Sequence, residues 1–327
     1  MRLTLIPVLA GILAAPAAAQ QREEWFYYPG SFNWAFLRRY PQAGRLFNAF
    51  DYGHAVLYER LYLEPDAPVE RLERTEFDFL TTDLLRRPPR FAVAEEAVAP
   101  VYSRLASRAV QMFDWAHLLH RQIYDVYADE RIPAAEKPGL VERLTDYYLD
   151  NRALAFAAVP KSMALMEGEY YSTAFRRRYP KFNGLIWAYH WLQVGLYEPL
   201  LGADSPAARA AGVEMTVERF WAMVNQPSTR LPGIMPMTPA VAPRFTGRHP
   251  RAAAIFDNLH MMHDIVSDIL ASDKVPRSRK AKVIEAALAE FRDGSKHTMS
   301  AAEWREMAEM MGGVGRMGGV AWPPPAP

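Results

Sequence analysis

Apolar residues recur at helical spacing along most of the chain. A period near 3.6 residues is typical of an amphipathic helix, and prolines separate the stretches that show it, whereas no stretch alternates as a strand would. The pattern therefore predicts an all-α fold, a bundle of antiparallel helices. Two Pro-rich connections, about 64–100 and 226–250, exceed the usual length and are expected to be loops that act as lids or pack over a site. Helices are expected at 45–63, 102–128, 138–158, 184–201, 213–225, 251–271, 278–292 and 300–311.

Much of the sequence occurs twice. The stretch AFLRRYPQAGRLFNAFDYGHAVLYERLY at 35–62 aligns without a gap with AFRRRYPKFNGLIWAYHWLQVGLYEPLL at 174–201, an offset of 139. Further on, FDWAHLLHRQIYD at 113–125 recurs as FDNLHMMHDIVSD at 256–268, an offset of 143. This period is far longer than a solenoid unit and indicates a duplicated domain or half-domain. The sequence thus predicts two tandem helical repeats with a pseudo-twofold relationship, 25–163 and 164–306.

The two ends of the chain differ from the repeats. Residues 1–19 combine Arg2, an apolar run and a small-residue ending, the pattern of a secretory signal peptide. They predict an exported protein, most simply a periplasmic one. No later run approaches the roughly 20 apolar residues that a membrane span needs, so the mature chain is expected to have none. The Gly- and Pro-rich tail, 312–327, is expected to be disordered.

Composition removes several classes of site and partner. The chain has no cysteine, which excludes disulfides, thiolate metal sites, iron–sulfur clusters and c-type haem. Lys plus Arg (38) nearly balances Asp plus Glu (37), so charge gives no case for binding nucleic acid. The sequence also lacks the G-x-S-x-G, P-loop and dinucleotide-binding motifs, which disfavours nucleophilic hydrolases and nucleotide enzymes. An unidentified small molecule or redox partner remains the expected ligand.

The repeated F-D-x-x-H-x-x-H segment is the strongest candidate for chemistry. Residues three apart on a helix share a face, so two histidines and an aspartate form one polar row in each copy. Such a row suits a divalent metal, with carboxylates as ligands or as acceptors that orient the histidines. Nitrogen and oxygen ligands favour Fe, Mn or Zn, and copper less. The predicted metal-binding residues of the two rows are Asp114, His117 and His120, then Asp257, His260 and His263.

Two repeated glutamates are predicted to complete the site. Glu59 and Glu198 lie in the LYE segments of a neighbouring helix, as in bundles that hold two metals between carboxylates and histidines. An ion pair with the repeated Arg-Arg dyads is an equally good interpretation. On the same helix His54 aligns with a glutamine, and His190 with an aspartate. Both histidines are expected at the surface or at helix caps. If the two halves instead line one centre, these histidines would make its two sides unequal.

Three functions of different classes follow from these residues. The first is an exported metal-binding protein, of the non-haem di-metal oxidoreductase kind, in which any open coordination position is reactive. The second is a b-type haem electron carrier with one axial histidine from each repeat. The third is a metal-free binding or scaffold protein in which the repeated polar row orders the core. Methionine-rich stretches would suit copper, although methionines more often fill helix faces.

Overall fold

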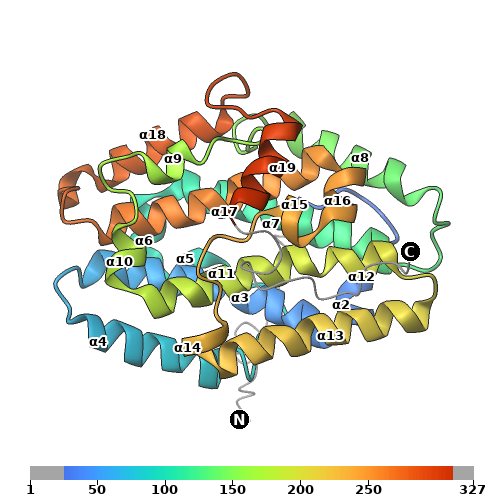
Figure 1. Cartoon of the computed structure of the whole chain (residues 1–327), viewed down its shortest axis with the longest axis horizontal. Coiled ribbons are helices and arrows are strands. Elements are labelled where there is room, and N and C mark those ends of the chain that lie inside the picture. Colours follow the sequence, from blue (N-terminus) through green and yellow to red (C-terminus); the bar gives the residue numbers. More distant parts are fainter. Residues whose placement is uncertain (1–25, 312–327) are drawn as a thin grey trace, which may run out of the picture.

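The computed structural model describes residues 26–311 and confirms the all-α class. Within this range no strand forms, and one isolated antiparallel bridge joins Lys161 to Thr298. The predicted signal peptide and the Gly/Pro-rich tail lie outside the described residues (Figure 1). None of the described helices combines the length and the apolar character required to cross a bilayer.

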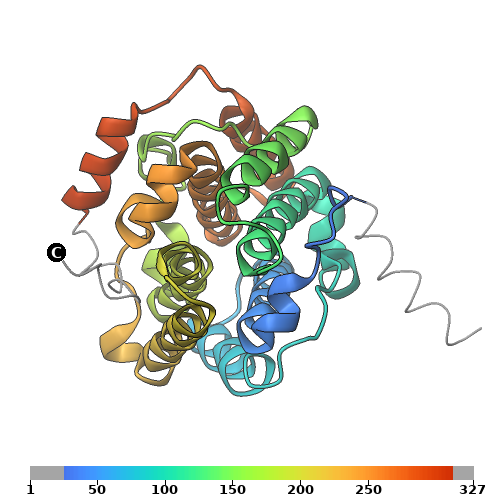
Figure 2. The ribbon, with the colours of Figure 1, turned by 90° about the vertical axis from the view of Figure 1, so that its right-hand side faces the viewer.

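Four long helices form the centre of the bundle and run along its longest axis (Figure 1). Seen end on, they lie side by side around a common interior (Figure 2). The two from the second half of the chain are buried almost all round, as expected of core helices rather than of surface helices. The four are α3 (Pro41–Leu63), α7 (Ser107–Ala128), α11 (Pro180–Gly195) and α17 (Pro250–Ala271).

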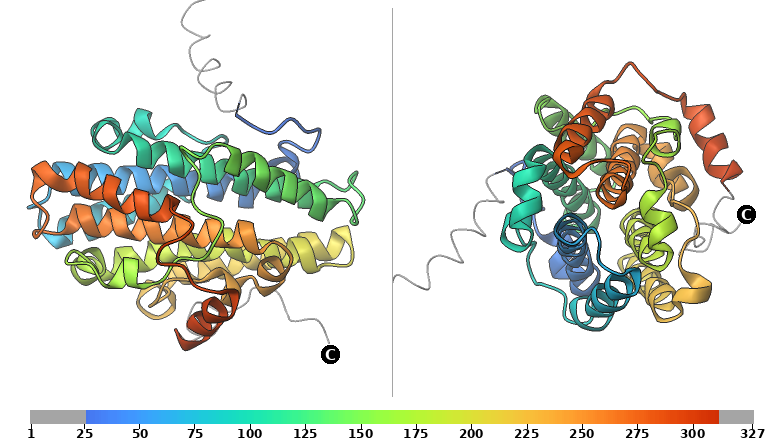
Figure 3. Two further views of the ribbon diagram at one scale, coloured as in Figure 1. Left: turned by 90° about the horizontal axis from the view of Figure 1, so that it is seen from above. Right: turned by 90° about the vertical axis from the view of Figure 1, so that its left-hand side faces the viewer.

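Three outer helices cover this centre. In Figure 1, α18 (Lys280–Arg292) and α8 (Lys137–Asp150) lie along the top, and α13 (Pro206–Asn225) lies along the bottom. Two pack mainly on a long helix, α8 on α7 and α18 on α17, whereas α13 packs equally on α11 and on the short helix that follows it, α12 (Tyr197–Gly202). The views in Figure 3 show the same pairing from above and from the other end. The covering helices exclude water from the interior. Any site between the four long helices is therefore shielded from solvent.

The two connections predicted as loops contain short helices, which corrects that prediction. In the first connection residues 69–84 are helical without a break, but most of them are π-helical, and a π-helix does not keep a 3.6-residue period. The other segments, of four to six residues, are too short to show a period. The first connection holds α4 (Val69–Arg71), the π-helical η1 (Leu72–Glu76) and η2 (Phe79–Leu84), and α5 (Glu95–Val98). The second holds α14 (Pro227–Arg230), α15 (Thr238–Val241) and α16 (Pro243–Arg248). The remaining elements are α2 (Ala35–Arg39), α6 (Pro100–Leu105), α9 (Ala164–Glu167), α10 (Ala174–Arg178), α12 (Tyr197–Gly202), η3 (Arg277–Arg279) and α19 (Ala301–Met310).

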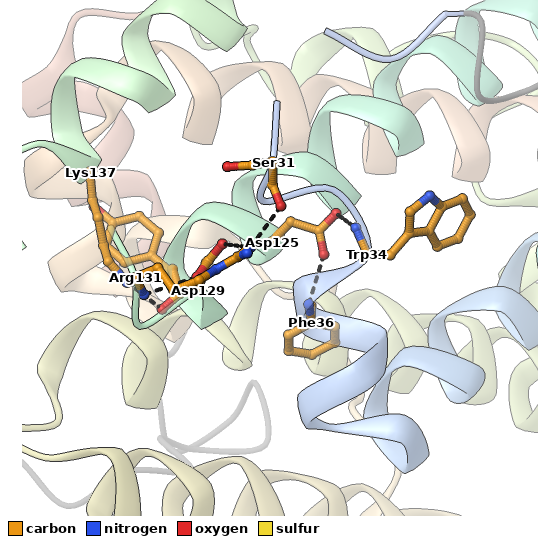
Figure 4. A network of polar contacts seen from close by, with 8 residues as sticks. Ser31, Trp34, Phe36, Asp125, Asp129, Arg131 and Lys137 are labelled. Carbon is orange, nitrogen blue, oxygen red and sulfur yellow. Dashed lines mark hydrogen bonds and ion pairs between the residues drawn. The ribbon is translucent and has the colours of Figure 1, made fainter. Parts of the chain in front are cut away.

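Two buried aspartates anchor short helices to long ones. The Asp125 carboxylate of α7 accepts the backbone N–H groups of Trp34 and Phe36, both at 2.8 Å, at the start of α2 (Figure 4). Asp268 of α17 accepts two backbone N–H groups in the same way before α10, at 2.7 and 2.8 Å. Trp34 and Thr173 precede the two short helices with left-handed φ angles of 69° and 62°. These carboxylates satisfy N–H groups that a helix start leaves without partners.

Candidate metal centre

Six histidines meet in the interior between the four long helices. Each is at most 1% exposed, and their rings form a continuous series of contacts. Burying a polar ring is costly unless its nitrogens find partners, so such a concentration of imidazoles needs a physical reason. The six are His54 from α3, His117 and His120 from α7, His190 from α11, and His260 and His263 from α17.

Three of these histidines come close enough to share one metal ion. His54, His190 and His263 each offer a ring nitrogen, and these atoms all lie within 4.8 Å of one another. The Nε2 atoms of His54 and His190 are 3.2 Å apart. Two ligands bound at about 2.05 Å in a tetrahedral site would be about 3.3 Å apart. The His54–His190 spacing therefore matches a first coordination shell, and His263, from a third helix, places a nitrogen within 4.8 Å of both.

Backbone hydrogen bonding sets the chemistry of one ligand. The Nδ1–H of His54 donates to the carbonyl oxygen of Phe50, one helical turn earlier, at 2.8 Å. Because a carbonyl can only accept, the neutral ring carries its proton on Nδ1 and has a lone pair on Nε2. That Nε2 is the atom directed at His190. A backbone carbonyl that fixes a histidine tautomer in this way is a recurrent feature of metal sites.

The third member of the trio has no hydrogen-bond partner on either ring nitrogen. Both Nδ1 and Nε2 of His263 are buried and unbonded, as is Nδ1 of His190. Leaving a buried polar atom unsatisfied costs about 1–3 kcal/mol. A metal ion bound to the trio would remove part of this cost, so the orphaned nitrogens fit a metal better than a purely structural hydrogen-bond network.

The other three histidines are held by neighbouring polar groups. Nδ1 of His117 lies 3.1 Å from Oδ1 of Asp51, which also forms an ion pair with Arg121. Nδ1 of His120 and the hydroxyl of Tyr197 form a hydrogen bond of 2.8 Å. Nε2 of His260 lies 3.1 Å from the side-chain oxygen of Gln193. The 3.1 Å approach of His117 to Asp51 is not a hydrogen bond: both ring nitrogens of His117 are buried without a hydrogen-bond partner, as are Nε2 of His120 and Nδ1 of His260.

Burial keeps all six rings neutral, which is the form that binds metals. Removal from water lowers the pKa of His54 to about 4 and that of His117 to about 3. Positively charged neighbours contribute to this lowering of the pKa: a protonated His117 in the case of His54, and Arg121 in the case of His117. The same causes hold the pKa well below its ordinary value in His120, His190, His260 and His263.

The repeated glutamates bind helix starts in this structure. Glu59 accepts the backbone N–H groups of Val101, at 3.1 Å, and Tyr102, at 2.7 Å, where α6 begins. Glu198 accepts the backbone N–H of Arg244 and also its guanidinium, both at 2.9 Å, where α16 begins. Negative charge at a helix N-terminus is favourable. The contacts shown for both carboxylates thus lie at helix ends rather than with the trio.

The aspartates of the repeated motif also lie outside the trio. Oδ1 of Asp257 accepts the N–H and the hydroxyl of Thr238, at 2.9 and 2.6 Å, and Oδ2 accepts the indole N–H of Trp304 at 2.7 Å. These bonds attach α15 and α19 to α17. Asp114 is half-buried and lines a surface cavity whose described lining residues do not include His117.

The sequence predicted the cluster but only one member of the trio. The structure brings His117, His120, His260 and His263 into one interior, and of these His263 belongs to the trio. The expectation that His54 and His190 lie at the surface or at caps is wrong, since they are 1% and 0% exposed. The sequence did contain a signal for these two residues. Each lies on a repeated helix at a position where the other copy has a different residue, and such a difference would make the two sides of one shared centre unequal.

Comparison with known proteins does not identify this arrangement of histidines. No protein-family model matches the chain, and no match was found among the curated proteins or the solved structures.

Proposed function

We propose that this protein binds a transition-metal ion through His54, His190 and His263. The observation that carries the proposal is that three fully buried imidazoles from three helices place one nitrogen each within 4.8 Å of the others. Three protein ligands leave a coordination position for water or substrate, which is the arrangement of catalytic rather than structural sites. A metal bound there would supply Lewis-acid or redox chemistry.

The ligand chemistry favours some metals over others. Imidazole suits Zn, Fe and Cu, whereas Mn is more at home among carboxylates. Because Glu59, Glu198 and Asp257 are engaged by other groups, the trio offers only imidazole. We therefore propose Zn, Fe or Cu ahead of Mn, which raises copper above its position in the sequence-based prediction.

The spacing of the trio speaks against haem. Two axial histidines on opposite sides of a haem iron, each bound at about 2 Å, would have ligand nitrogens about 4 Å apart. By comparison, the Nε2 atoms of His54 and His190 are only 3.2 Å apart. The ring centroids of His54 and His263 are 4.3 Å apart, so these two rings are in contact. A porphyrin would have to separate rings that are in contact, so an ion without a macrocycle is the better proposal.

The proposal has two further parts, a second metal ion and a duplicated architecture. The unbonded nitrogens of His117, His120 and His260 supply donors for the di-metal centre predicted from the sequence. Matched contacts in the two halves support a pseudo-twofold pair of repeats: Asp125 and Asp268 each anchor a short helix. The wider ligand set with Asp114, Asp257, Glu59 and Glu198, the repeat boundaries and the export to a periplasm stay predictions.

Metal analysis of untagged protein tests the proposal directly. We expect inductively coupled plasma mass spectrometry to find near-stoichiometric Zn, Fe or Cu after purification without chelator. A Soret band would instead favour the haem reading. A well-folded protein that contains no metal and takes none up would contradict the proposal and leave the metal-free binding or scaffold function.

Metal retention should extend to unusually low pH. Protons and metal compete for the same lone pairs, and burial lowers the pKa of His54 to about 4, whereas an exposed histidine has a pKa near 6.5. Competition therefore begins only as the pH falls toward 4, and we expect the ion to stay bound at pH 5.5. Dialysis over a pH series, with metal content and circular dichroism measured on each sample, checks this. Complete loss at pH 6 from protein that is still folded would contradict it.

Replacing Glu198 with glutamine distinguishes a helix-end role from metal binding. Glutamine keeps the shape but loses the charge that faces Arg244 and the start of α16. We expect the free energy of unfolding to fall by about 1–3 kcal/mol, because hydrogen bonds to a charged group are lost. The metal content should stay unchanged. Urea denaturation and metal analysis measure the two effects. A loss of metal with unchanged stability would instead place Glu198 among the ligands.

A further inference from the structure

A cavity opens on the side of α7 that faces away from the histidines. Its volume is about 250 Å³. Trp115 and Leu118 of α7 form part of its wall, together with Phe26 and Leu154. An apolar cavity of about 150 Å³ is enough to hold benzene. This one therefore has room for a single ring with a short polar arm.

The polar part of the cavity is predominantly negative. Glu96 and Asp114 line it, and Arg121, which also lines it, forms an ion pair with Asp51. Glu95 is not a lining residue; it is 1% exposed and has no hydrogen-bond partner on either carboxyl oxygen, and burial raises its pKa well above the ordinary value, so it stays protonated near neutral pH and adds no negative charge. Its electrostatic neighbours include Asp114 and Glu96. Among the lining residues that the structure describes, the charged groups are Glu96, Asp114 and Arg121, so carboxylates outnumber guanidinium groups there.

In the second half of the chain, the aspartate that corresponds to Asp114 is buried and hydrogen-bonded. At the offset of 143, Glu95 aligns with Thr238 and Asp114 aligns with Asp257. Thr238 donates its backbone N–H and its hydroxyl to Asp257, which is 1% exposed. In the first half a carboxyl group replaces that hydroxyl donor, and Asp114 faces the cavity. The acidic cavity is therefore not an inherited feature of the repeated helices but belongs to the first half.

We infer that this cavity binds a small organic cation, a primary ammonium group attached to an apolar ring. The ring would lie against Trp115, Leu118 and Leu154, and the ammonium would face Asp114 and Glu96. An ammonium in contact with carboxylates and beside an aromatic wall gains from both charge pairing and cation–π attraction. The inference does not rest on the proposed metal site, since no member of the trio lines the cavity.

Isothermal titration calorimetry with three matched probes tests this inference. Benzylammonium, benzyl alcohol and benzoate share a ring and differ in charge. We expect benzylammonium to bind at least tenfold more tightly than the alcohol and benzoate not to bind. Asp114→Asn should weaken benzylammonium about tenfold, the size of one partly buried charge contact. Glu96→Gln, at an exposed carboxylate, should weaken it about two- to fivefold. Glu214→Gln, an exposed carboxylate on α13, is the control and should change nothing.

Each alternative result has a definite meaning. Equal binding of benzylammonium and benzyl alcohol would overturn the inference in favour of an apolar cavity without charge preference. Binding of benzoate alone would show that Arg121 dominates and would also overturn it. No binding by any probe would overturn it outright. If Asp114→Asn fails to fold, the exposed Glu96→Gln variant still decides, because an unchanged affinity in that variant contradicts the role given to the carboxylates.

Discussion

Replacing His190 with alanine should abolish the proposed metal binding, because the two remaining imidazoles of the trio would not hold an ion tightly. Zinc sites with four ligands bind with about 10–16 kcal/mol, roughly 3 kcal/mol per ligand, so one lost ligand should weaken binding at least about a hundredfold. His190 is fully buried, and its Nε2 lies 3.2 Å from that of His54. Metal analysis after dialysis should find less than about a tenth of the wild-type content.

Controls separate ligand loss from damage to the fold. His297→Ala removes a histidine that is half-exposed and lies apart from the trio, so its metal content should equal that of the wild type. His54→Ala and His263→Ala should behave like His190→Ala. Circular dichroism and thermal melting of the metal-free proteins show whether each variant folds. Unchanged metal in all three folded trio variants would refute the assignment.

Replacing Asp268 with alanine should cause the largest loss of stability. Its carboxylate accepts the backbone N–H groups of Thr173 and Phe175 at 2.7 and 2.8 Å, and it holds the left-handed turn at Thr173 that begins α10. Hydrogen bonds to a charged group contribute about 1.5–3 kcal/mol each, and the orphaned donors add to the loss. We expect the free energy of unfolding, measured by urea denaturation, to fall by about 3–5 kcal/mol.

The first half of the chain supplies a matched experiment. Asp125 makes the same two contacts with Trp34 and Phe36, so Asp125→Ala should cost about as much as Asp268→Ala. Asp150→Ala, at the exposed end of α8, should stay within about 0.5 kcal/mol of the wild type, as surface substitutions usually do. A cost below 1 kcal/mol for either anchor would show that its short helix is held mainly by apolar packing.

The long helices were predictable because their apolar faces repeat over several turns. Predicted ranges such as 251–271 differ by one residue from α17 (Pro250–Ala271). The predicted helix at 138–158 instead ends at Asp150 in α8. Beyond it the N–H of Ala157 bonds to the carbonyl of Phe291, a contact between distant segments that no local period reveals. Tertiary contacts of this kind override local preference.

The site was only half predictable for a related reason. The histidine rows of α7 and α17 follow from helical spacing, but which nitrogens approach each other depends on how four helices pack. His54 and His190 enter the trio only because α3 and α11 face the same interior. The acidic residues have a second possible use that the sequence does not show. The carboxylate of Glu59 binds backbone N–H groups at a helix start, a use that its spacing from the histidines in the sequence does not reveal.

The depth of the trio governs how fast an ion can come and go. His54, His190 and His263 are at most 1% exposed, beneath helices that pack on every side. An ion cannot leave by a side-chain rotation, because no ligand has a face toward solvent. Exchange must wait for the long helices to separate locally, an opening whose free energy approaches that of unfolding in a well-packed core. Loading during folding, before the bundle closes, is thus kinetically easier than loading afterwards, and the residence time of the ion becomes a property of the whole bundle.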